Sequence, residues 1–312
     1  MEVINDLNLK KQAKEFGVSV WQTPGFLFIV IALIGLVAMS ATSIFSRKSF
    51  EPEALVIIES IIAALILTAG NFVVRIAEQT IRLNRAKGEF VSVASHQLRT
   101  PLSAICWETE LFLSKFKKNL TKAQIKNIEN INALSNRMTR LVNDLLDVTR
   151  IDQKRLILKK ESVDMVKIIE EQIGELLSLA KSRNIEIVFS PKKNIPKALG
   201  DNSKIKIVVE NLLSNSIKYT TNRGKVEIKI SKKDDFIITS IKDNGVGIPE
   251  EQIDRVFEKF FRSDNAVKYQ TDGTGLGLYI AKSIVEQSGG RIWFQSVENL
   301  GTIFSFSLPI KK

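Results

Sequence analysis

The sequence of 312 residues has a single cysteine and a single histidine. The lone Cys106 excludes a disulfide within the chain, which fits a reducing compartment for its soluble part. A metal site built from several Cys and His ligands is excluded for the same reason. Charge is also missing from one long stretch, because no charged residue occurs between Glu15 and Arg47. The N-terminal part is therefore unusually apolar.

Two common nucleotide-binding patterns are absent as well. The sequence has no GxxxxGK[ST] loop and none of the VAIK, HRD and DFG motifs of protein kinases. The net charge of +11 comes from dispersed lysines and arginines, without a basic run interleaved with aromatics. We therefore expect no nucleic-acid partner. The charge fits solvated surfaces, juxtamembrane positions or the docking of an acidic protein.

Two apolar runs predict a hairpin of membrane-spanning helices. Residues 25–45 and 54–74 each have about the length that crosses a lipid membrane, and Glu59 is the one charged residue in them. Residues 46–53 between the runs are too short for a ligand-binding domain. Two buried helices of a soluble domain are the alternative. Glu59 near the outer end of its helix either senses a signal or reaches the headgroups.

Basic residues flank the hairpin on the sides of both chain ends. By the positive-inside rule, this favours a multi-pass protein of the cell (inner) membrane with its N-terminus and its catalytic part in the cytoplasm. The short turn holds two basic residues of its own, so the bias is modest. The residues concerned are Lys10, Lys11 and Lys14 before the hairpin, Arg47 and Lys48 in the turn, and Arg75, Arg82, Arg85 and Lys87 after it.

A helical hairpin is predicted next. Apolar residues spaced alternately by four and three positions follow each other along 98–116 and again along 134–148, a pattern typical of a helix-packing seam. Thr121 is suited to cap the second helix. Because one hairpin covers only part of each seam, we expect a homodimer with a four-helix bundle.

His96 falls on the solvent-facing side of the first helix of this hairpin, two positions before Leu98. Pro101 follows about one turn later and cannot donate to the carbonyl of Gln97, which predicts a kink. An exposed neutral imidazole beside a kink can accept a phosphoryl group. A lone histidine is more often structural, and the spacing alone leaves both interpretations open.

After Asp152 the pattern changes to strands mixed with helices, which predicts an α+β sandwich with helices on one face of a mixed sheet. Residues 263–272 show neither pattern, as a mobile lid over a nucleotide would. We expect strands at 156–161, 185–189, 225–230, 236–243, 291–296 and 302–309, and helices at 164–181, 203–219 and 277–287.

Four motifs in this region suit a nucleotide. The first places Asn211, Asn215 and either Lys218 or Tyr219 on one helix face, where amide oxygens and an ammonium fit a magnesium triphosphate. The second starts at Asp243, whose carboxylate at a strand end can accept the amine of adenine. Its glycines, Gly245 and Gly247, allow a sharp turn.

The third and fourth motifs suit phosphate groups. Arg262 ends an apolar run whose phenylalanines form a hydrophobic plug. The fourth motif opens the helix at 277–287, where backbone amides bind phosphate well. It consists of Gly273, Thr274, Gly275, Leu276 and Gly277. Each motif alone is weak evidence, whereas the four in this order are strong.

These motifs resemble those of one family. SHQLRTPL at 95–102 resembles the H-box of the histidine kinase dimerisation and phosphotransfer domain, and the four motifs resemble the N, G1, F and G2 boxes of the histidine kinase catalytic domain. The resemblance implies a membrane-bound sensor histidine kinase of a two-component system with a Bergerat-type ATP-binding fold. It implies that ATP phosphorylates His96, that a response regulator receives the phosphoryl group on an aspartate, and that phosphatase activity can accompany the kinase.

The same resemblance implies roles for the site residues. Asn215 would ligate Mg²⁺ with support from Asn211, Asp243 would recognise adenine, and Tyr219 would line the adenine pocket. Lys218 and Arg262 would contact phosphates, and Thr100 would orient water in the phosphatase reaction. The glycines Gly245, Gly247, Gly273, Gly275 and Gly277 would shape the pocket and its lid.

One position departs from the family pattern. Gln97 stands where the family usually has an acidic residue proposed to activate the imidazole. An amide can orient the ring but cannot take up a proton near neutral pH. This predicts slower autophosphorylation, or a scaffold or phosphatase that has lost kinase activity. An ATPase like DNA gyrase B or MutL is a further alternative, against which the H-box and the membrane hairpin argue.

The expected organisation has three parts: a tail and membrane hairpin at 1–75, the dimeric phosphotransfer hairpin at 76–152, and the ATP-binding domain at 153–312. Residues 76–88 are predicted to join the second span to the His96 helix as one continuous helix. Movement of that span would then pass directly to His96.

Overall fold

The computed structural model describes residues 9, 13, 19–46, 52–153, 155–191, 194–221, 223–269 and 273–310, and it separates into two compact units, 1–94 and 95–312. Some expectations lie outside the described residues. These concern the basic residues Lys10, Lys11, Lys14, Arg47 and Lys48, and the last part of the 263–272 segment.

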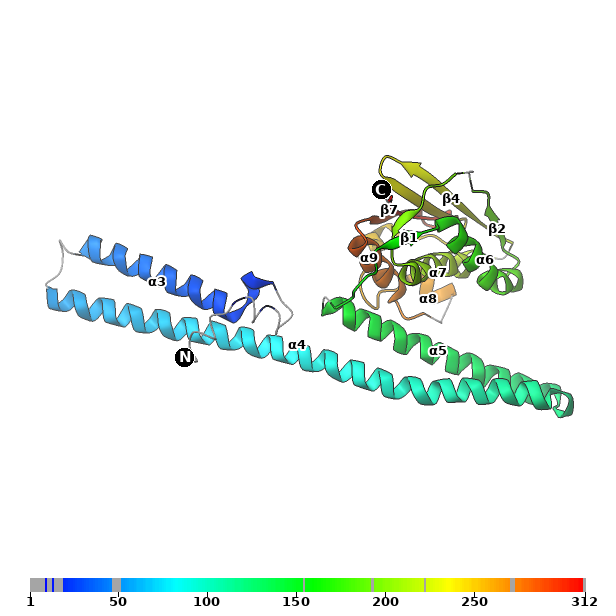
Figure 1. Cartoon of the computed structure of the whole chain (residues 1–312), viewed down its shortest axis with the longest axis horizontal. Coiled ribbons are helices and arrows are strands. Elements are labelled where there is room, and N and C mark those ends of the chain that lie inside the picture. The colour runs from blue at the N-terminus through cyan, green and yellow to red at the C-terminus, as the bar shows by residue number, and fades with distance from the viewer. Residues whose placement is uncertain are drawn as a thin grey trace. The chain divides into compact units, whose positions relative to one another are not determined.

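The first unit consists of a short 3-10 turn, η1 (Val20–Gln22), the helix α3 (Pro24–Ser46) and the first part of α4 (Pro52–Phe116). Figure 1 shows α3 lying along α4. The two helices approach closely at glycines: a Cβ on Gly35 would lie 3.0 Å from Ile66 Cγ2, and one on Gly70 would lie 2.9 Å from Ile31 Cγ2. Each helix thus lays an isoleucine against a glycine of the other.

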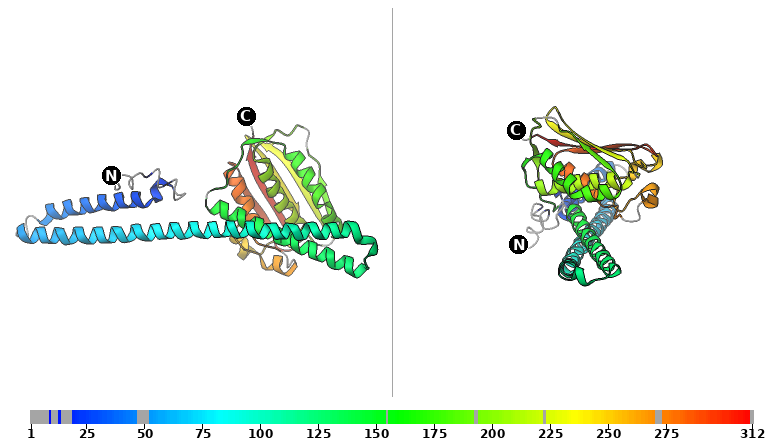
Figure 2. Two further views of the ribbon diagram at one scale, coloured as in Figure 1. Left: turned by 60° about the horizontal axis from the view of Figure 1, so that its bottom comes forward. Right: turned by 90° about the vertical axis from the view of Figure 1, so that its right-hand side faces the viewer.

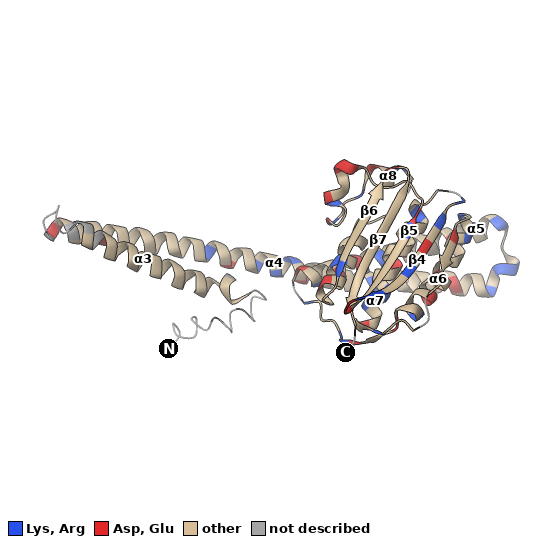
Figure 3. Cartoon of the chain, turned by 90° about the horizontal axis from the view of Figure 1, so that it is seen from above, with Lys and Arg blue, Asp and Glu red and all other residues tan. Residues whose placement is uncertain are grey.

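Both helices contain a stretch that is long and apolar enough to cross a membrane by length and composition. The apolar windows have mean hydropathies of 2.4 and 2.1, and only 11% and 6% of their residues are buried. Figure 3 shows how sparse charged residues are along α3 and the α4 stretch beside it. The two span-length helices expected from the sequence are therefore present.

The second unit begins with the helical hairpin. It contains the remainder of α4 from Ser95, the turn η2 (Lys117–Asn119) and α5 (Lys122–Asp152). Thr121 caps α5 as predicted: Gln124 N donates to Thr121 Oγ1 at 3.3 Å, and Thr121 N donates to Gln124 Oε1 at 2.9 Å. α4 is continuous through residues 76–88 and includes Pro101.

The apolar seam of this hairpin is only partly covered. Of the predicted seam on α5, Val148 is buried, whereas Leu134 is 58% and Met138 is 50% exposed; the buried Val142 and Leu146 lie beside the seam and not on it. Apolar side chains left in water along a 4-3 repeat are typical of a surface that packs on another helix pair. This exposure fits the expected four-helix bundle of two chains.

The remainder of the second unit is an α+β sandwich built on a mixed sheet, as predicted. The sheet has the strand order β2-β4-β5-β7-β6, in which β2 pairs with β4 in parallel and the other pairs are antiparallel. Its strands are β2 (Glu186–Phe189), β4 (Lys225–Lys233), β5 (Phe236–Asp243), β6 (Arg291–Val297) and β7 (Gly301–Pro309).

Helices cover one face of this sheet, as Figure 2 shows. They are α6 (Met165–Ser182), α7 (Asn202–Tyr219) and α9 (Gly277–Gln287). Alternate residues of β4, Val226, Ile228 and Ile230, are buried against them, as the period of two in a strand requires. The core formed by these helices and the sheet holds the ends of α7, β5 and α9 in place for the site described below.

Two sequence predictions were wrong in this domain. Residues 156–160 form no strand, because Lys159 N donates to the carboxylate of Asp201 at 3.0 Å; the strand β1 (Glu161–Val163) starts later and pairs with β3 (Ala198–Gly200), which was not predicted. The 263–272 segment contains a helix, α8 (Asp264–Tyr269). Ser263 supports its start, since Ala266 N donates to Ser263 Oγ at 3.3 Å.

Candidate functional site

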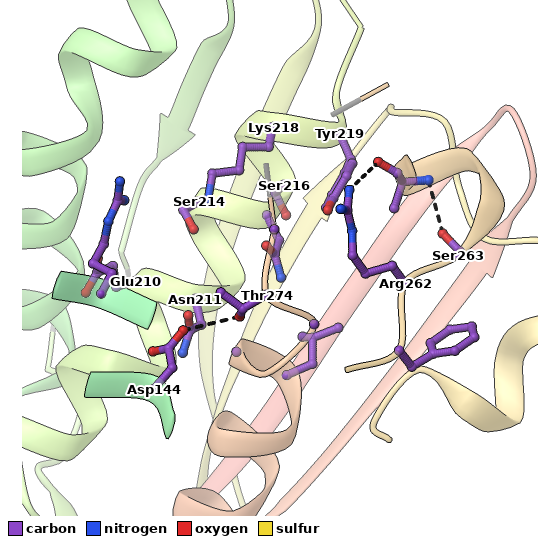
Figure 4. A pocket seen from close by; sticks show the side chains of 18 of the residues that line it. Asp144, Glu210, Asn211, Ser214, Ser216, Lys218, Tyr219, Arg262, Ser263 and Thr274 are labelled. Atoms are coloured by element: carbon purple, nitrogen blue, oxygen red, sulfur yellow. Dashed lines mark hydrogen bonds between the residues drawn. The ribbon is translucent and has the colours of Figure 1, made fainter. Parts of the chain in front are cut away.

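A cavity of about 850 Å³ lies in the second unit, between α5, α7, the segment after β5, the residues around Arg262 and the start of α9. Eleven of the residues predicted for the nucleotide site line it: Asn211, Asn215, Lys218, Tyr219, Asp243, Gly247, Arg262, Gly273, Thr274, Gly275 and Gly277. Gly245 is buried beside Asp243, and Leu276 is buried in the core. Figure 4 shows how the side chains from these elements converge.

α7 supplies one wall. Asp201 caps this helix, and Val208, Leu212 and Leu213 bury its opposite face, which turns Asn211, Asn215 and Lys218 toward the cavity. Burial lowers the pKa of Lys218, and the nearby cation Arg140 on α5 adds to the effect. An anionic ligand would stabilise the charged form of an ammonium that burial and a neighbouring cation disfavour.

Asp243 lies at the end of β5 with a fixed orientation. Its Oδ1 accepts hydrogen bonds from Gly245 N at 3.0 Å and from Thr302 N at 3.1 Å. Burial raises the pKa of this carboxyl group, while the two backbone donors oppose the rise. A buried carboxylate held by one oxygen can accept a hydrogen bond from an amine of a bound base through its other oxygen.

Gly245 allows this arrangement because no side chain fits there. A Cβ at this position would lie 2.3 Å from the carbonyl oxygen of Tyr219. That carbonyl also accepts a hydrogen bond from Val246 N at 3.1 Å. The end of α7 and the turn after β5 are thereby joined backbone to backbone, which places Tyr219 and Asp243 in the same cavity.

The glycine-rich loop before α9 forms another wall. Thr274 Oγ1 accepts a hydrogen bond from Leu276 N at 3.1 Å, and Gly275 has a φ of 69°, which favours glycine. A Cβ on Gly277 would lie 2.7 Å from Asn211 Oδ1. The N-terminus of α9 is thus next to the polar face of α7, where its backbone amides can bind phosphate oxygens.

Arg262 lines the cavity next to Tyr219. Its Nη2 donates to the carbonyl oxygen of Ala266 at 3.0 Å, so the side chain is tied to α8. Burial raises the pKa of Tyr219, and the neighbouring Arg262 opposes this rise. The guanidinium therefore lies close enough to Tyr219 to act on a ligand that contacts both.

His96, Gln97 and Thr100 are not part of this cavity. All three are exposed on α4, as predicted for His96 from the heptad position. One turn away, Arg99 Nη2 donates to Asn143 Oδ1 of α5 at 2.7 Å, and Asn143 lines the cavity. The structure therefore brings together the residues predicted for a nucleotide site and leaves the H-box residues accessible on α4.

Sequence reasoning missed the contribution of α5. Asp144 on this helix lines the cavity, and its Oδ2 accepts a hydrogen bond from Thr274 Oγ1 at 3.2 Å. Burial raises the pKa of Asp144 to about 6, with the charges of Asp147 and Glu210 contributing and Arg140 opposing. No local sequence pattern marks Asp144, because its partners come from a distant part of the chain.

Comparisons with known proteins agree with this geometry. The family model described as "His Kinase A (phospho-acceptor) domain" matches residues 86–154, and that described as "Histidine kinase-, DNA gyrase B-, and HSP90-like ATPase" matches residues 200–312. The chain is 33% identical over 244 residues to the sensor histidine kinase WalK of Bacillus subtilis, which covers 74% of this chain and 38% of that protein.

Two further similarities point the same way. Over 232 residues the chain is 32% identical to the signal transduction histidine-protein kinase BarA of Escherichia coli K12, covering 72% of this chain and 25% of BarA. The crystal structure of full-length ShkA in complex with AMPPNP superimposes with a TM-score of 0.59 at 26% identity, over 72% of this chain and 46% of ShkA. The chain spans less than half the length of each of these three proteins.

The chain belongs to the sensor histidine kinases of two-component systems. The family and the fold class predicted from the boxes are confirmed.

Proposed function

We propose that this protein transfers the γ-phosphoryl group of ATP to His96 and then to an aspartate of a response regulator. One observation carries the proposal: a cavity lined by Asp243 and by the N-terminus of α9 belongs to the same compact unit as the part of α4 that exposes His96. A bound adenine at Asp243 would direct the phosphates toward α9, where helix amides bind anions.

We assign the polar side chains around the cavity to ATP. Asp243 recognises the adenine amine, Tyr219 lines the base pocket, and Lys218 and Arg262 contact phosphates. The backbone of 273–277 encloses the phosphate groups. In support, burial disfavours the charge of Lys218, so a phosphate restores favourable interactions to it.

Asn215, with Asn211 beside it, is assigned to Mg²⁺. Both residues line the cavity, and an amide oxygen is a hard neutral ligand of the kind that Mg²⁺ takes. Among the described residues no group of three or more His, Cys, Asp or Glu side chains could hold a metal ion. The ion would therefore take most of its ligands from phosphate oxygens and water, and it would neutralise charge on the phosphates during transfer.

The reaction at His96 is a phosphoryl transfer. A nitrogen of the neutral imidazole attacks the γ-phosphorus, the bond from that phosphorus to the bridging oxygen breaks, and ADP leaves with the electron pair. The ring then loses a proton. Gln97 is exposed beside His96 and can orient the ring but cannot accept that proton, so water takes it. Thr100 lies one turn on and is exposed, which suits the orientation of water in a phosphatase reaction.

We assign a role to each of the three expected parts of the chain. The membrane hairpin comprises 1–75, the dimeric phosphotransfer hairpin 76–152 and the ATP-binding domain 153–312. We assign the protein to the cell (inner) membrane as a multi-pass protein spanned by α3 and the first part of α4, with its N-terminus and its catalytic parts in the cytoplasm. A second copy of the chain covers the exposed seam of α4 and α5. No nucleic-acid partner is expected. Support comes from the apolar windows of α3 and α4 and from the exposure of Leu134 and Met138.

The test uses the full chain in detergent with γ-labelled ATP and Mg²⁺. Label that is labile in acid and stable in alkali should appear in the wild type and be lost in His96→Gln. Label that persists in His96→Gln would place the phosphate elsewhere. ATP hydrolysis without any protein-bound label would favour a simple ATPase instead.

A further inference from the structure

The helix α5 presents three carboxylates to the ATP-binding domain. Asp144 accepts from Thr274 Oγ1 at 3.2 Å, Asp147 pairs with Lys204 at 3.0 Å, and Asp152 pairs with Lys259 at 2.6 Å. Asp152 lies away from the cavity lining, whereas Asp144 lines the cavity and contacts the glycine-rich loop assigned above to the phosphates. Asp144 can therefore act on a ligand in the cavity, whereas Asp152 only joins α5 to the ATP-binding domain.

The charges around Asp144 are unfavourable for a carboxylate. From its own helix, Asp147 repels it and Arg140 attracts it; from α7, Glu210 repels it; Thr274 supplies a hydrogen bond. Figure 4 shows Asp144 directed at Thr274, with Asn211 close by and Glu210 on the same side. A triphosphate placed at the N-terminus of α9 would add further negative charge to this group.

Building on the proposed function, we propose that Asp144 is a positioning residue that makes ATP affinity depend on α5. With its hydrogen bond to Thr274 it holds the glycine-rich loop on α5, and with its charge it competes with the phosphates for that loop. ATP binding thus releases Thr274 from Asp144. Any movement that withdraws α5 from the loop raises the affinity for ATP, which connects the phosphotransfer hairpin to nucleotide loading.

Two variants test the effect of the Asp144 charge separately from its hydrogen bond to Thr274. In Asp144→Asn the amide oxygen still accepts from Thr274, but the negative charge is gone. Removing one unit charge close to a polyanion in a partly desolvated cavity should tighten ATP binding about 3- to 10-fold. Arg140→Gln removes a cation from the same group and should weaken ATP binding by a similar factor. Adenosine carries no phosphate, so its affinity should stay unchanged in both variants.

Binding is measured calorimetrically on the full chain in detergent, in a His96→Gln background so that ATP is not consumed. Asp152→Asn is the matched control, because it removes a negative charge of α5 from an ion pair with Lys259 outside the cavity lining, while its amide oxygen can still accept a hydrogen bond. It should leave the ratio of ATP to adenosine affinity unchanged. Added salt should shrink the difference between wild type and Asp144→Asn.

The expected result is tighter ATP binding in Asp144→Asn, weaker binding in Arg140→Gln and no change in Asp152→Asn. Unchanged or weaker ATP binding in Asp144→Asn would overturn the proposal. Equal shifts in Asp144→Asn and Asp152→Asn would also overturn it, because general undocking of α5 would then explain both. Failure of the kinase reaction itself would show separately, as ATP binding without label on His96 in the unmodified chain.

Discussion

Replacing Gly245 by alanine should damage the site and the fold together. The new Cβ would lie 2.3 Å from the carbonyl oxygen of Tyr219 and 2.8 Å from its carbonyl carbon. These are backbone atoms at the end of α7, so no side-chain rotation can relieve the clash. The backbone must separate, which breaks the hydrogen bond from Val246 N to the Tyr219 carbonyl and disturbs the one from Gly245 N to Asp243.

The magnitude follows from these losses. Overpacking in a dense interior destabilises by about 1–3 kcal/mol, and each lost hydrogen bond adds about 1 kcal/mol. We therefore expect a destabilisation of about 2–4 kcal/mol, which lowers the melting temperature of a domain of this size by roughly 5–15 °C. Because Tyr219 and Asp243 both move, ATP affinity should fall at least about tenfold, the equivalent of 1.4 kcal/mol.

Gly174→Ala is the matched control. Gly174 lies within α6, and a Cβ there would meet nothing within 4 Å. Alanine in a helix interior is more favourable than glycine by about 0.5–1 kcal/mol, so this variant should be slightly more stable. Calorimetry of the full chain should follow the transition that ATP shifts upward. A Gly245→Ala protein that melts with the wild type and binds ATP equally well would refute the packing argument.

Three further predictions concern pH, the H-box and α4. The folded pKa of Asp144, about 6, lies above its unfolded value of 3.8, so ionisation of Asp144 opposes folding fully above pH 6, less as the pH falls from 6, and no longer below the unfolded pKa. Asp144→Asn should therefore gain about 1–3 kcal/mol in unfolding free energy at pH 7.5 and only about a third of that at pH 4.5, measured in thermal melts. An equal gain at both pH values would contradict this. Gln97→Glu should raise the initial rate of His96 labelling at least about tenfold, because a base typically contributes about 10²–10⁴-fold; an unchanged rate would show that this position supplies no base. Inserting two residues after Arg85 turns the following helix by about 200° and should change the labelling of His96. Inserting seven residues, close to two full turns, should largely preserve the labelling. Labelling that neither insertion affects would exclude direct coupling along α4.

The lining of the cavity was predictable because most of the residues proposed for it occur in short local motifs. Asn211, Asn215 and Lys218 lie on one helix face, and Gly273 to Gly277 follow one another at a helix start. Within each motif, the spacing alone brings the residues together. Asp243 was predictable from its position at a strand end. Each of these signals depends on residues close in sequence.

Asp144 shows what such signals miss. It lies 130 residues from Thr274, and only the packing of α5 beside α9 brings the two together. The wrong strand at 156–160 has a related cause, since the apolar residues there resemble a strand but the backbone donor of Lys159 is taken by a side chain 42 positions away. The helix α8 was missed because its polar sequence has no apolar periodicity to reveal it.

The central claim is that the cavity and His96 are two parts of one phosphotransfer enzyme. The most direct test measures ATP binding and acid-labile label on the same full-length samples of wild type, His96→Gln and Asp243→Ala. We expect His96→Gln to bind ATP normally and take no label, whereas Asp243→Ala should lose both. Acid-labile label on a protein that no longer binds ATP at this cavity, or label retained without His96, would contradict it.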